Sequence, residues 1–517
     1  STQVVTLKVT DTAGKPVSGQ PVQVSLAEAA GGSLSQAPPQ QSLTLSPIAR
    51  RGLTNDRGEL SVSYTASRRA EAKADTLTTT VEFAKVTGQS VSVATIPGPA
   101  HHYRVSPTKV VAVKAADLPL KASAQLVDEF DNPVTGQRTL KWSTDDGGTL
   151  QKAKMKLSNT GLATATWTGD ESKRWVYHVR VTDDQGLSGE SAALCLLPSK
   201  PRTDAIVLGP NGYFRKGKDG PAWVPLGGFY ANWCGLSRDG EEGRQLISFV
   251  DATEAQLDHW LAFLASQGVT GMRFMLRAHT PKGMEPMDII GRVNMPLFAK
   301  ALRYMDLARK YDIRFMLTIH EDYTKPAYFD RKAFETFCLP QYAGEDLDKL
   351  PPFQRRFVRD RKFIDTIGLK YTDPDVMACQ DQYTRQLLGL LKDNPQLYSW
   401  EFENEMVDCP QSWAQHMAGV IRSVDPVTPI CASHGGGGIN TGDPLWWTKK
   451  SGIDFYTYHL YPHLGSTSPT IDFGAATDVL TTYGRMAGVC MLGETAGDEF
   501  EVYPRSAMPT AGISCAT

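Results

Sequence analysis

The sequence has no long apolar run and almost no net charge, and each absence excludes a broad class of protein. Within its 517 residues no apolar stretch approaches the ~20 residues of a membrane-spanning helix. The formal net charge is -2, so the charge balance favours no nucleic-acid or strongly acidic partner. We therefore expect neither a membrane span nor nucleic-acid binding, and we expect several domains in a chain of this length.

Paired cysteines and glycine fingerprints are also missing. None of the eight cysteines forms a Cys-x-x-Cys pair, so zinc-ribbon and thioredoxin-like sites have no support. No glycine-rich dinucleotide fingerprint follows a predicted strand. We expect no metal and no cofactor. Cysteines inside apparent strands, such as Cys431 and Cys490, are interpreted as small buried hydrophobes.

The first part of the chain is rich in β-strand alternation. Up to about residue 97, runs of Val, Thr and Ser alternate with a period of two, and turn signals such as Asn55-Asp56-Arg57-Gly58 separate them. Short strands at this spacing are typical of a β-sandwich. The segment from about 27 to 50 is polar and contains prolines, and we interpret it as a long loop.

A second copy of this pattern follows the first. The segment Asp128–Val134 echoes Asp11–Val17, and Gly147-Gly148 echoes Gly31-Gly32. The repeat predicts two tandem all-β sandwiches, over residues 1–98 and 99–198. The patterns DTAGKPVSGQPVQVSL and LTNDRGELSVSYTA resemble the bacterial Ig-like modules of invasins and intimins. That resemblance implies a bacterial protein that is secreted or displayed at the cell surface, in an extracellular or periplasmic location.

Beyond Leu197–Pro201, short apolar strands alternate with amphipathic helices, as in an α/β domain with parallel strands. We expect this domain to span residues 199–517. Its predicted strands are 223–230, 270–276, 313–320, 397–404, 429–433, 453–459 and 489–494. Its predicted helices are 253–268, 296–311, 374–394, 413–424 and 471–486. Residues 321–372 are too long for a simple connection, so they are interpreted as a functional or locally folded insertion.

Seven strands in this alternation favour a (β/α)8 TIM barrel over an open sheet. The eighth strand is missing from the pattern, because the residues after Glu494 include Pro504, Pro509 and Gly512 and no strong helix. The expected fold is therefore multidomain, with two Ig-like sandwiches followed by a TIM barrel that apparently lacks its eighth strand. Either the barrel is C-terminally incomplete, or a second polypeptide or a C-terminal fragment completes it.

One predicted strand, in the stretch LYSWEFENEM, carries three carboxylates on one face: Glu401, Glu403 and Glu405. A buried charge is costly unless it is paired. Two interpretations are open from these residues alone. The stretch is either an edge strand with a solvated acidic face or the bearer of a catalytic acid at the mouth of a barrel.

Other polar residues gather at the predicted carboxyl ends of the strands, where TIM barrels place catalysis. They are Arg273, His320, Asn404, Glu405, His434, His459, Tyr461 and Glu494. Two glutamates across a barrel can cleave an acetal. One protonates the leaving oxygen and later activates water, while the other attacks the anomeric carbon. In a retaining enzyme their carboxyl groups lie ~5–5.5 Å apart.

Five segments resemble clan A glycoside hydrolases, and most of all glycoside hydrolase family 5, the cellulase and mannanase family. They are GVTGMRFML, FMLTIH, WEFENE, FYTYHLY and MLGE. The resemblance implies a retaining O-glycosyl hydrolase of β-linked polysaccharides or oligosaccharides, with Glu405 as acid/base and Glu494 as nucleophile. It also implies substrate contacts by Arg273, His320, Asn404, His459 and Tyr461. Trp233, Trp446 and Trp447 are candidate sugar platforms in loops after strands.

The resemblance departs at the eighth strand, because that strand carries a tryptophan in the family and no Trp follows Trp447 here. Glu401 is interpreted as an interior structural acid paired with Arg273, and Glu403 as deeper or out of phase. An alternative makes Glu403 the acid/base. Another alternative is a cell-surface carbohydrate-binding or adhesin protein with an inactive barrel. A third is a metal-dependent hydrolase that uses His320, His434 and His459.

Overall fold

The computed structural model describes most of the chain. The described residues are 2–26, 32–37, 42–66, 68, 75–82, 86–87, 90–93, 96–198, 202–210, 212–227, 231–236, 245–320, 326–404, 406, 409–434, 452–459, 489–494 and 514–516. Several predicted features lie outside them: Glu405, Trp446, Trp447, Tyr461 and the helix at 471–486. The backbone of His434, His459 and Glu494 is described, and their side chains are not.

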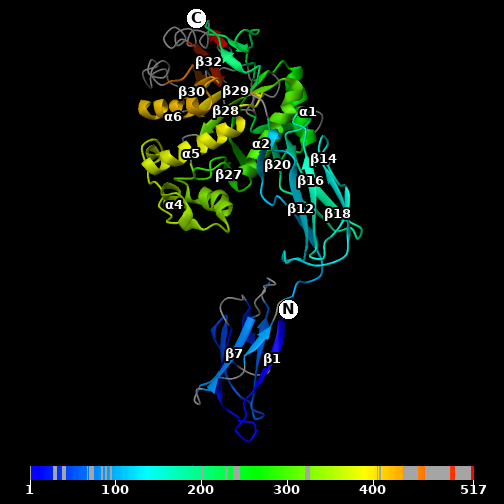
Figure 1. The fold of residues 1–517 in the computed structure, drawn as a ribbon. Coiled ribbons are helices and arrows are strands. Elements are labelled where there is room, and N and C mark those ends of the chain that lie inside the picture. Colours follow the sequence, from blue (N-terminus) through cyan, green and yellow to red (C-terminus); the bar gives the residue numbers. More distant parts are fainter. Residues whose placement is uncertain are drawn as a thin grey trace.

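The N-terminal sandwich lies at one end of the molecule and the α/β domain at the other (Figure 1). Two sheets of the N-terminal part face each other. One contains β1 (Thr2–Lys8), β6 (Glu59–Thr65) and β3 (Ser33–Gln36); the other contains β4 (Ser42–Ser46), β5 (Ala49–Leu53), β2 (Pro21–Leu26), β7 (Asp75–Val81), β8 (Val86–Thr87) and β9 (Val91–Val93). Alternate residues of β2 and β6, such as Val24 and Val62, are fully buried between the sheets.

The predicted loop at 27–50 was wrong, because β3 and β4 fall inside it and β5 begins within it. Leu34 of β3 is buried in the sandwich core. These strands have only four or five residues each. Such short strands give too few alternations for a period of two to stand out, and the prolines near their ends resemble loop composition.

The second sandwich has its own core around Trp142, Trp167 and Tyr177. Its strands form three sheets. The first contains β10 (His102–Val105), β12 (Leu120–Val127), β16 (Leu162–Thr168) and β14 (Thr149–Leu150), and the second contains β11 (Val111–Lys114), β20 (Leu194–Leu197) and β17 (Val176–Tyr177). The third contains β15 (Lys154–Lys156), β13 (Thr139–Thr144), β18 (Val179–Asp183) and β19 (Ser188–Glu190). A short 3-10 helix, η2, spans Ala115–Asp117.

The two sandwiches share the turn that the sequence repeat predicted. Asp11 accepts hydrogen bonds from the backbone N–H groups two and four residues later, and so does Asp128, all at 2.9 Å. In both turns the residue before the aspartate forms an isolated bridge with the proline five residues after the aspartate. The aspartate satisfies the backbone donors of its own turn, so the same corner forms in both domains.

The α/β domain is built on one sheet with the order β25 (Gly271–Met275), β28 (Arg314–His320), β29 (Leu397–Glu403), β30 (Ile430–His434), β31 (Phe455–His459), β32 (Val489–Glu494) and β33 (Ser514–Ala516). The first six strands pair in parallel, as the sequence predicted, whereas β33 pairs antiparallel to β32. The antiparallel β33 is not the parallel eighth strand of a TIM barrel, and nothing supports a second polypeptide. The closed barrel stays a prediction.

The predicted first strand at 223–230 is not a strand in its described part, residues 223–227. Leu226 still accepts backbone hydrogen bonds from Thr270 and Gly271, so the segment runs beside the start of β25. Pro225 has no N–H to donate, which explains why a regular ladder does not form. One hairpin precedes this segment, β21 (Ile206–Leu208) with β22 (Phe214–Lys216), and another follows it, β23 (Trp233–Leu236) with β24 (Gln245–Ser248).

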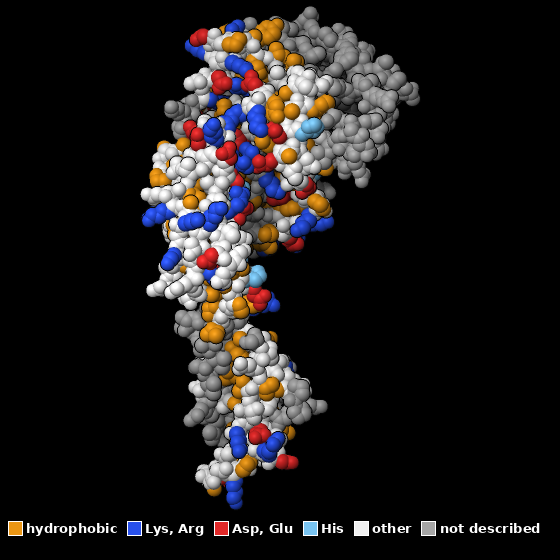
Figure 2. Space-filling model, turned by 90° about the vertical axis from the view of Figure 1, so that its right-hand side faces the viewer, with side chains coloured by type: hydrophobic (Ala, Val, Ile, Leu, Met, Phe, Trp, Pro, Cys, Tyr) orange, Lys and Arg blue, Asp and Glu red, His pale blue; other side chains and the backbone are white. Residues whose placement is uncertain are grey.

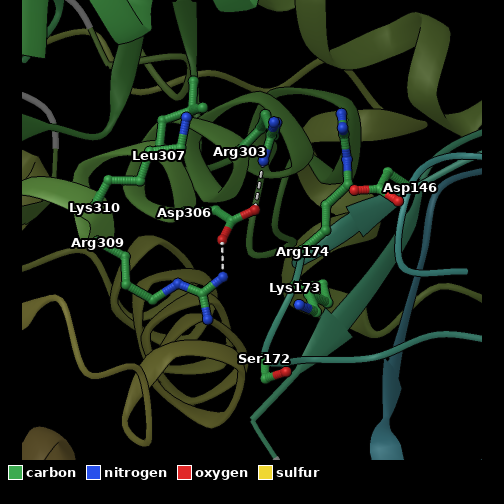
Figure 3. Close-up of a pocket in the computed structure, with 9 residues that line it drawn as sticks. All are labelled: Asp146, Ser172, Lys173, Arg174, Arg303, Asp306, Leu307, Arg309 and Lys310. Atoms are coloured by element: carbon green, nitrogen blue, oxygen red, sulfur yellow. Dashed lines mark hydrogen bonds and ion pairs between the residues drawn. The ribbon is translucent and has the colours of Figure 1, made fainter.

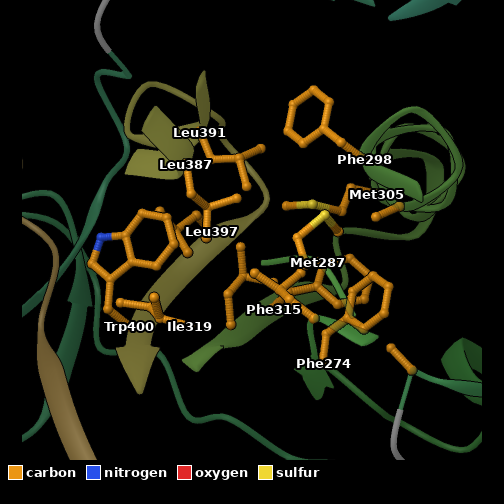
Figure 4. Packing of buried hydrophobic residues seen from close by; sticks show 14 of the residues in the cluster. Phe274, Met287, Phe298, Met305, Phe315, Ile319, Leu387, Leu391, Leu397 and Trp400 are labelled. Atoms are coloured by element: carbon orange, nitrogen blue, oxygen red, sulfur yellow. The ribbon is translucent and has the colours of Figure 1, made fainter. Parts of the chain in front are cut away.

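Helix α1 (Glu254–Ser266) precedes the first parallel strand, and three further helices connect parallel strands: α2 (Met295–Ala308), α5 (Pro374–Leu391) and α6 (Gln411–Val424). Thr253 and Gln256 form a capping box at the start of α1. Large apolar residues of the sheet, among them Phe274, Phe315 and Trp400, pack with residues of α2 and α5 in one core (Figure 4). A third hairpin, β26 (Arg277–Thr280) with β27 (Gly283–Pro286), extends beyond β25.

Helix α2 is buried on almost every side. Ten of its residues are buried, including Asp306. Only a narrow stripe with Pro296 and Lys300 is exposed, so the helix has neighbours on most of its sides. The sheet covers one side, and the second sandwich covers another: Trp175 donates its backbone N–H to Asp306 at 3.0 Å and belongs to the same core. Arg309, in the 3-10 helix η3 (Arg309–Tyr311), lies 4.8 Å from the centre of the Trp175 ring.

The insertion is locally folded in its described part. It contains α3 (Arg331–Ala333), η4 (Phe334–Cys338), η5 (Leu339–Tyr342), η6 (Leu347–Lys349), α4 (Pro352–Val358) and η7 (Ile367–Tyr371). Its core surrounds Tyr328, Phe357 and Cys379.

Among the described residues, no helix is long and apolar enough to cross a membrane.

Candidate active site

The inner face of the parallel sheet carries a buried ion pair. Arg273 on β25 donates from Nε and Nη2 to the two carboxylate oxygens of Glu401 on β29, at 2.8 and 2.7 Å. Thr318 and Thr457 also donate to this carboxylate, and Ser433 accepts a hydrogen bond from Arg273 at 3.3 Å. The predicted pairing of Glu401 with Arg273 is confirmed, and the carboxylate is fully buried.

Strand alternation explains how β29 carries acids into the interior. Trp400 and Phe402 belong to the core between the sheet and the helices, so Glu401 and Glu403 point to the other face. All seven residues of β29 are buried, and β28 and β30 flank the strand. The interpretation of this stretch as an edge strand with a solvated acidic face was therefore wrong.

Glu403 is paired as well, but with the insertion rather than with the sheet. Lys370 of η7 contacts one carboxylate oxygen of Glu403, and the Tyr371 hydroxyl donates to the other at 3.2 Å. The Lys370 and Glu403 side chains are 5% and 2% exposed. These contacts make Glu403 a paired structural acid at the end of the strand. The alternative that Glu403 is the acid/base stays a prediction.

His320 ends β28 and is enclosed by the helices. Its Nε2 lies 3.2 Å from the Thr384 hydroxyl, and its ring packs near Tyr383 and Trp413. Burial, together with the charge of Lys370, lowers the pKa of His320 to about 3. His320 is therefore a neutral imidazole at physiological pH. Its predicted contact with substrate stays a prediction.

Asn404 follows the last residue of β29 and has an unused acceptor. The residue is 7% exposed, and its Oδ1 atom is buried without a hydrogen-bond partner among the described residues. A buried polar atom without a partner is costly. Other atoms of this kind, such as those of Tyr304 and Gln354, lie elsewhere, whereas this one lies at the carboxyl end of β29. The next described residue, Met406, donates its N–H to the carbonyl of Ser433 on β30 at 3.0 Å.

The far side of the site lies on β31 and β32. These strands pair in parallel, and His459 and Glu494 are register partners at their carboxyl ends. In a parallel sheet all carboxyl ends lie at one edge, so the backbone of Glu494 shares the edge that bears Asn404 and His320. His434 ends β30 at the same edge.

Trp233 is half-buried and stacks on His279, with ring centres 4.4 Å apart and ring planes at 28°. The neighbouring Asn232 donates to the carbonyls of Met275 and Arg277, both at 2.7 Å. These bonds tie the tryptophan to the end of β25. The predicted platform therefore lies near the carboxyl edge of the sheet, and His279 is a partner that the sequence did not reveal.

A cleft of about 470 Å³ lies elsewhere, where the second sandwich meets α2 (Figure 3). It is lined by Asp146, Ser172, Lys173, Arg174, Arg303, Asp306, Leu307, Arg309 and Lys310. Asp306 accepts from both Arg303 and Arg309 there. No predicted site residue is among these described lining residues. We interpret the cleft as part of the domain junction.

Charges on the described surface are mixed. On the face shown in Figure 2, basic and acidic side chains intermingle over the second sandwich and the α/β domain. The described residues contain no group of three or more His, Cys, Asp or Glu side chains placed to hold a metal ion.

One curated protein is similar in sequence to part of this chain. No family model matches. A probable mannan endo-1,4-beta-mannosidase F of Emericella nidulans is 28% identical over 123 residues, which cover 20% of this chain. The aligned part spans 28% of that relative's length.

The search of solved structures found several proteins that resemble parts of this chain. A glycoside hydrolase family 5 mannosidase from Rhizomucor miehei is 16% identical, with 55% of this chain and 70% of that chain covered and a TM-score of 0.37. Our chain resembles glycoside hydrolase family 5. Endo-glycoceramidase II from Rhodococcus sp. is 17% identical, with 55% and 66% covered and a TM-score of 0.33. Invasin, a bacterial integrin-binding protein, is 17% identical, with 44% and 49% covered and a TM-score of 0.18.

Proposed function

We propose that this protein is a retaining glycoside hydrolase of β-linked glycans, with Glu405 as acid/base and Glu494 as nucleophile. The observation that carries the proposal is the paired Arg273–Glu401 layer inside the sheet, next to Asn404, whose Oδ1 has no hydrogen-bond partner within the described part of the chain. Paired structural acids leave the next glutamate in the sequence, Glu405, as the candidate proton donor. Asn404 would accept a hydrogen bond from a sugar hydroxyl.

The mechanism is a double displacement. The Glu494 carboxylate attacks the anomeric carbon while Glu405 gives its proton to the leaving oxygen, which forms a glycosyl-enzyme ester and releases the first product. Glu405, now ionised, takes a proton from water as that water attacks the anomeric carbon, and the bond from this carbon to the Glu494 carboxylate breaks. Release of the second sugar restores both groups. This chemistry requires the two carboxyl groups to lie ~5–5.5 Å apart.

The first substrate class to test is β-1,4-mannan, because the partial sequence relative is named as an enzyme that cleaves it. His459, Tyr461, His320 and the three tryptophans Trp233, Trp446 and Trp447 are proposed to contact the sugars. A secreted or cell-surface bacterial protein is part of the same proposal.

The deciding experiment measures hydrolysis by the full chain on a panel of β-mannan, β-glucan, xylan and galactan. Glu405→Gln and Glu494→Gln should each lower kcat by several orders of magnitude while the unfolding midpoint stays unchanged. Glu285→Gln, a change of a partly buried glutamate on the β26–β27 hairpin, serves as the matched control. Near-normal turnover in either glutamate variant would sink the assignment. Glycan binding without hydrolysis by the unmodified protein would favour a carbohydrate-binding function.

A further inference from the structure

The end of β29 contains a second buried ion pair that the mechanism does not use. Lys370 and Glu403 contact each other with almost no exposure to solvent. An isolated buried charge is expensive, and a buried pair often contributes little net stability compared with apolar residues. A pair of this kind directly before Asn404 and Glu405 therefore calls for an explanation beyond stability.

The titratable groups that face Glu403 come from several elements. Lys370 and Tyr371 come from η7, and His320 from β28 is the register partner of Glu403. Cys409 lies on the segment before α6, where burial and the charge of Glu403 raise the pKa of its thiol. Farther along β29, Glu401 is held by Arg273. Lys370 is the cation in direct contact with Glu403.

Covalent geometry brings this charge close to the proposed acid. Glu405 is two residues after Glu403 in the sequence, so their Cα atoms can be at most ~7 Å apart. At such a distance in a protein interior, one uncompensated charge shifts a carboxyl pKa by about one unit. Without a cation, the Glu403 carboxylate would oppose ionisation of Glu405.

We propose that Lys370 is a positioning residue of the candidate glycosidase: its ammonium balances Glu403 and thereby sets the acidity of Glu405. This inference rests on the proposed function. It also assigns a role to the insertion, because η7 belongs to the insertion and places the Lys370 ammonium at the end of β29. Lys370 acts through Glu403 and need not touch the sugar.

The test is the pH dependence of kcat/KM with the full chain, measured on the soluble β-linked glycan of the panel that it cleaves fastest, with β-1,4-mannan tried first. The alkaline limb of this profile reports the pKa of the proton donor in the free enzyme. In Glu403→Gln the unbalanced Lys370 favours ionised Glu405, so the limb should move to lower pH by about one unit. In the double variant Lys370→Met/Glu403→Gln the limb should return to the wild-type position.

A matched control is the exposed pair of Lys310 and Asp258, 2.9 Å apart. Asp258→Asn leaves a lysine unbalanced there and should not move the limb. If Glu403→Gln does not fold, Lys370→Met takes its place. Its limb should move to higher pH, because the Glu403 carboxylate then lacks the Lys370 ammonium and opposes ionisation of Glu405. A limb at the wild-type position or at lower pH in that variant would overturn the inference.

Two failures are distinguishable. If the unmodified protein hydrolyses none of the β-linked glycans of the panel, the proposed function is wrong and this inference falls with it. If it is active and the limb of a folded Glu403→Gln variant matches the wild type, only the role of Lys370 is wrong. A purely structural pair would change kcat or stability and leave the limb where it is.

Discussion

Arg273 and Glu401 are joined by two hydrogen bonds although β28 lies between their strands. Neighbouring strands are ~4.8 Å apart, so the pair spans about two strand spacings on the inner face. The planar guanidinium matches both carboxylate oxygens at once, which a lysine cannot do. This contact ties two strands whose carboxyl ends carry candidate site residues.

Removal of Arg273 should therefore destabilise the α/β domain strongly. Arg273→Met leaves the Glu401 carboxylate buried without its cation, and we expect a loss of ~3–5 kcal/mol in the free energy of unfolding. The double variant Arg273→Met/Glu401→Gln should recover much of this loss. Urea denaturation measures both. Arg359→Met breaks the exposed contact with Asp348 and should cost less than ~1 kcal/mol. Equal losses in the two single variants would contradict the prediction.

Trp233 should contribute to glycan affinity. In Trp233→Ala we expect kcat/KM on the cleaved glycan to fall roughly tenfold, which corresponds to ~1.4 kcal/mol of lost binding. Most of the change should lie in KM, because the residue would bind the sugar before and during the reaction alike. Tyr213→Ala changes another partly exposed aromatic residue and should leave kinetics unchanged. Unchanged KM in Trp233→Ala would remove the residue from the site.

Asp288 should make stability depend on pH. Burial raises its pKa to about 7, although hydrogen bonds from Tyr328 and from the backbone N–H of Gly291 act in the opposite direction. The ordinary value in an unfolded chain is ~3.9. A folded pKa above the unfolded one means that the stabilising contribution is complete below pH ~4 and is lost as pH rises towards 7.

In Asp288→Asn this loss should disappear. The difference in unfolding midpoint between pH 5 and pH 7.5, measured by thermal denaturation, should be smaller than in the wild type. Asp365→Asn changes an exposed aspartate of the same insertion and should keep the wild-type difference. An Asp288→Asn profile parallel to the wild type would show that Asp288 is ionised in the folded protein.

The two sandwiches should differ in how much they contribute to the stability of the rest of the chain. Removal of residues 1–98 should leave the unfolding midpoint of the remainder within a few degrees. Removal of residues 1–198 exposes α2 and uncovers Asp306, whose carboxylate accepts from Trp175 and two arginines. We expect that shorter chain to aggregate or to unfold well below the full chain, as measured by light scattering and calorimetry. Equal midpoints would refute this coupling.

Much of the fold follows from local patterns in the sequence. The parallel strands from β25 to β32 were predicted because each is a short apolar run, and helices with clear start signals, such as the Thr253–Gln256 capping box, precede or separate the first of them. The strand predicted at 223–230 was wrong in its described part, because its apolar composition was given more weight than Pro225, which has no N–H to donate. Strands β3 to β5 were missed because they are too short to display a period.

The candidate site was predictable only where one strand carries the signal. Arg273, Glu401 and Asn404 lie on or beside strands with recognisable motifs. Lys370 and His279 reach the same edge from an insertion and a hairpin, and their positions depend on long-range packing. Spacing along the chain contains no trace of those contacts. Roles for Glu405, Glu494 and Tyr461 remain predictions for the kinetic variants to decide.

Helix α2 is buried between the sheet and the second sandwich, and this burial determines which part of the chain can be moved into another protein. Domain shuffling and engineered fusions usually cut at linkers and move a catalytic domain by itself. Here a cut between the second sandwich and the α/β domain would divide one hydrophobic core. It would also separate Asp306 in α2 from its hydrogen-bond partner Trp175 in the second sandwich. The smallest portable unit that contains the α/β domain therefore begins at the second sandwich.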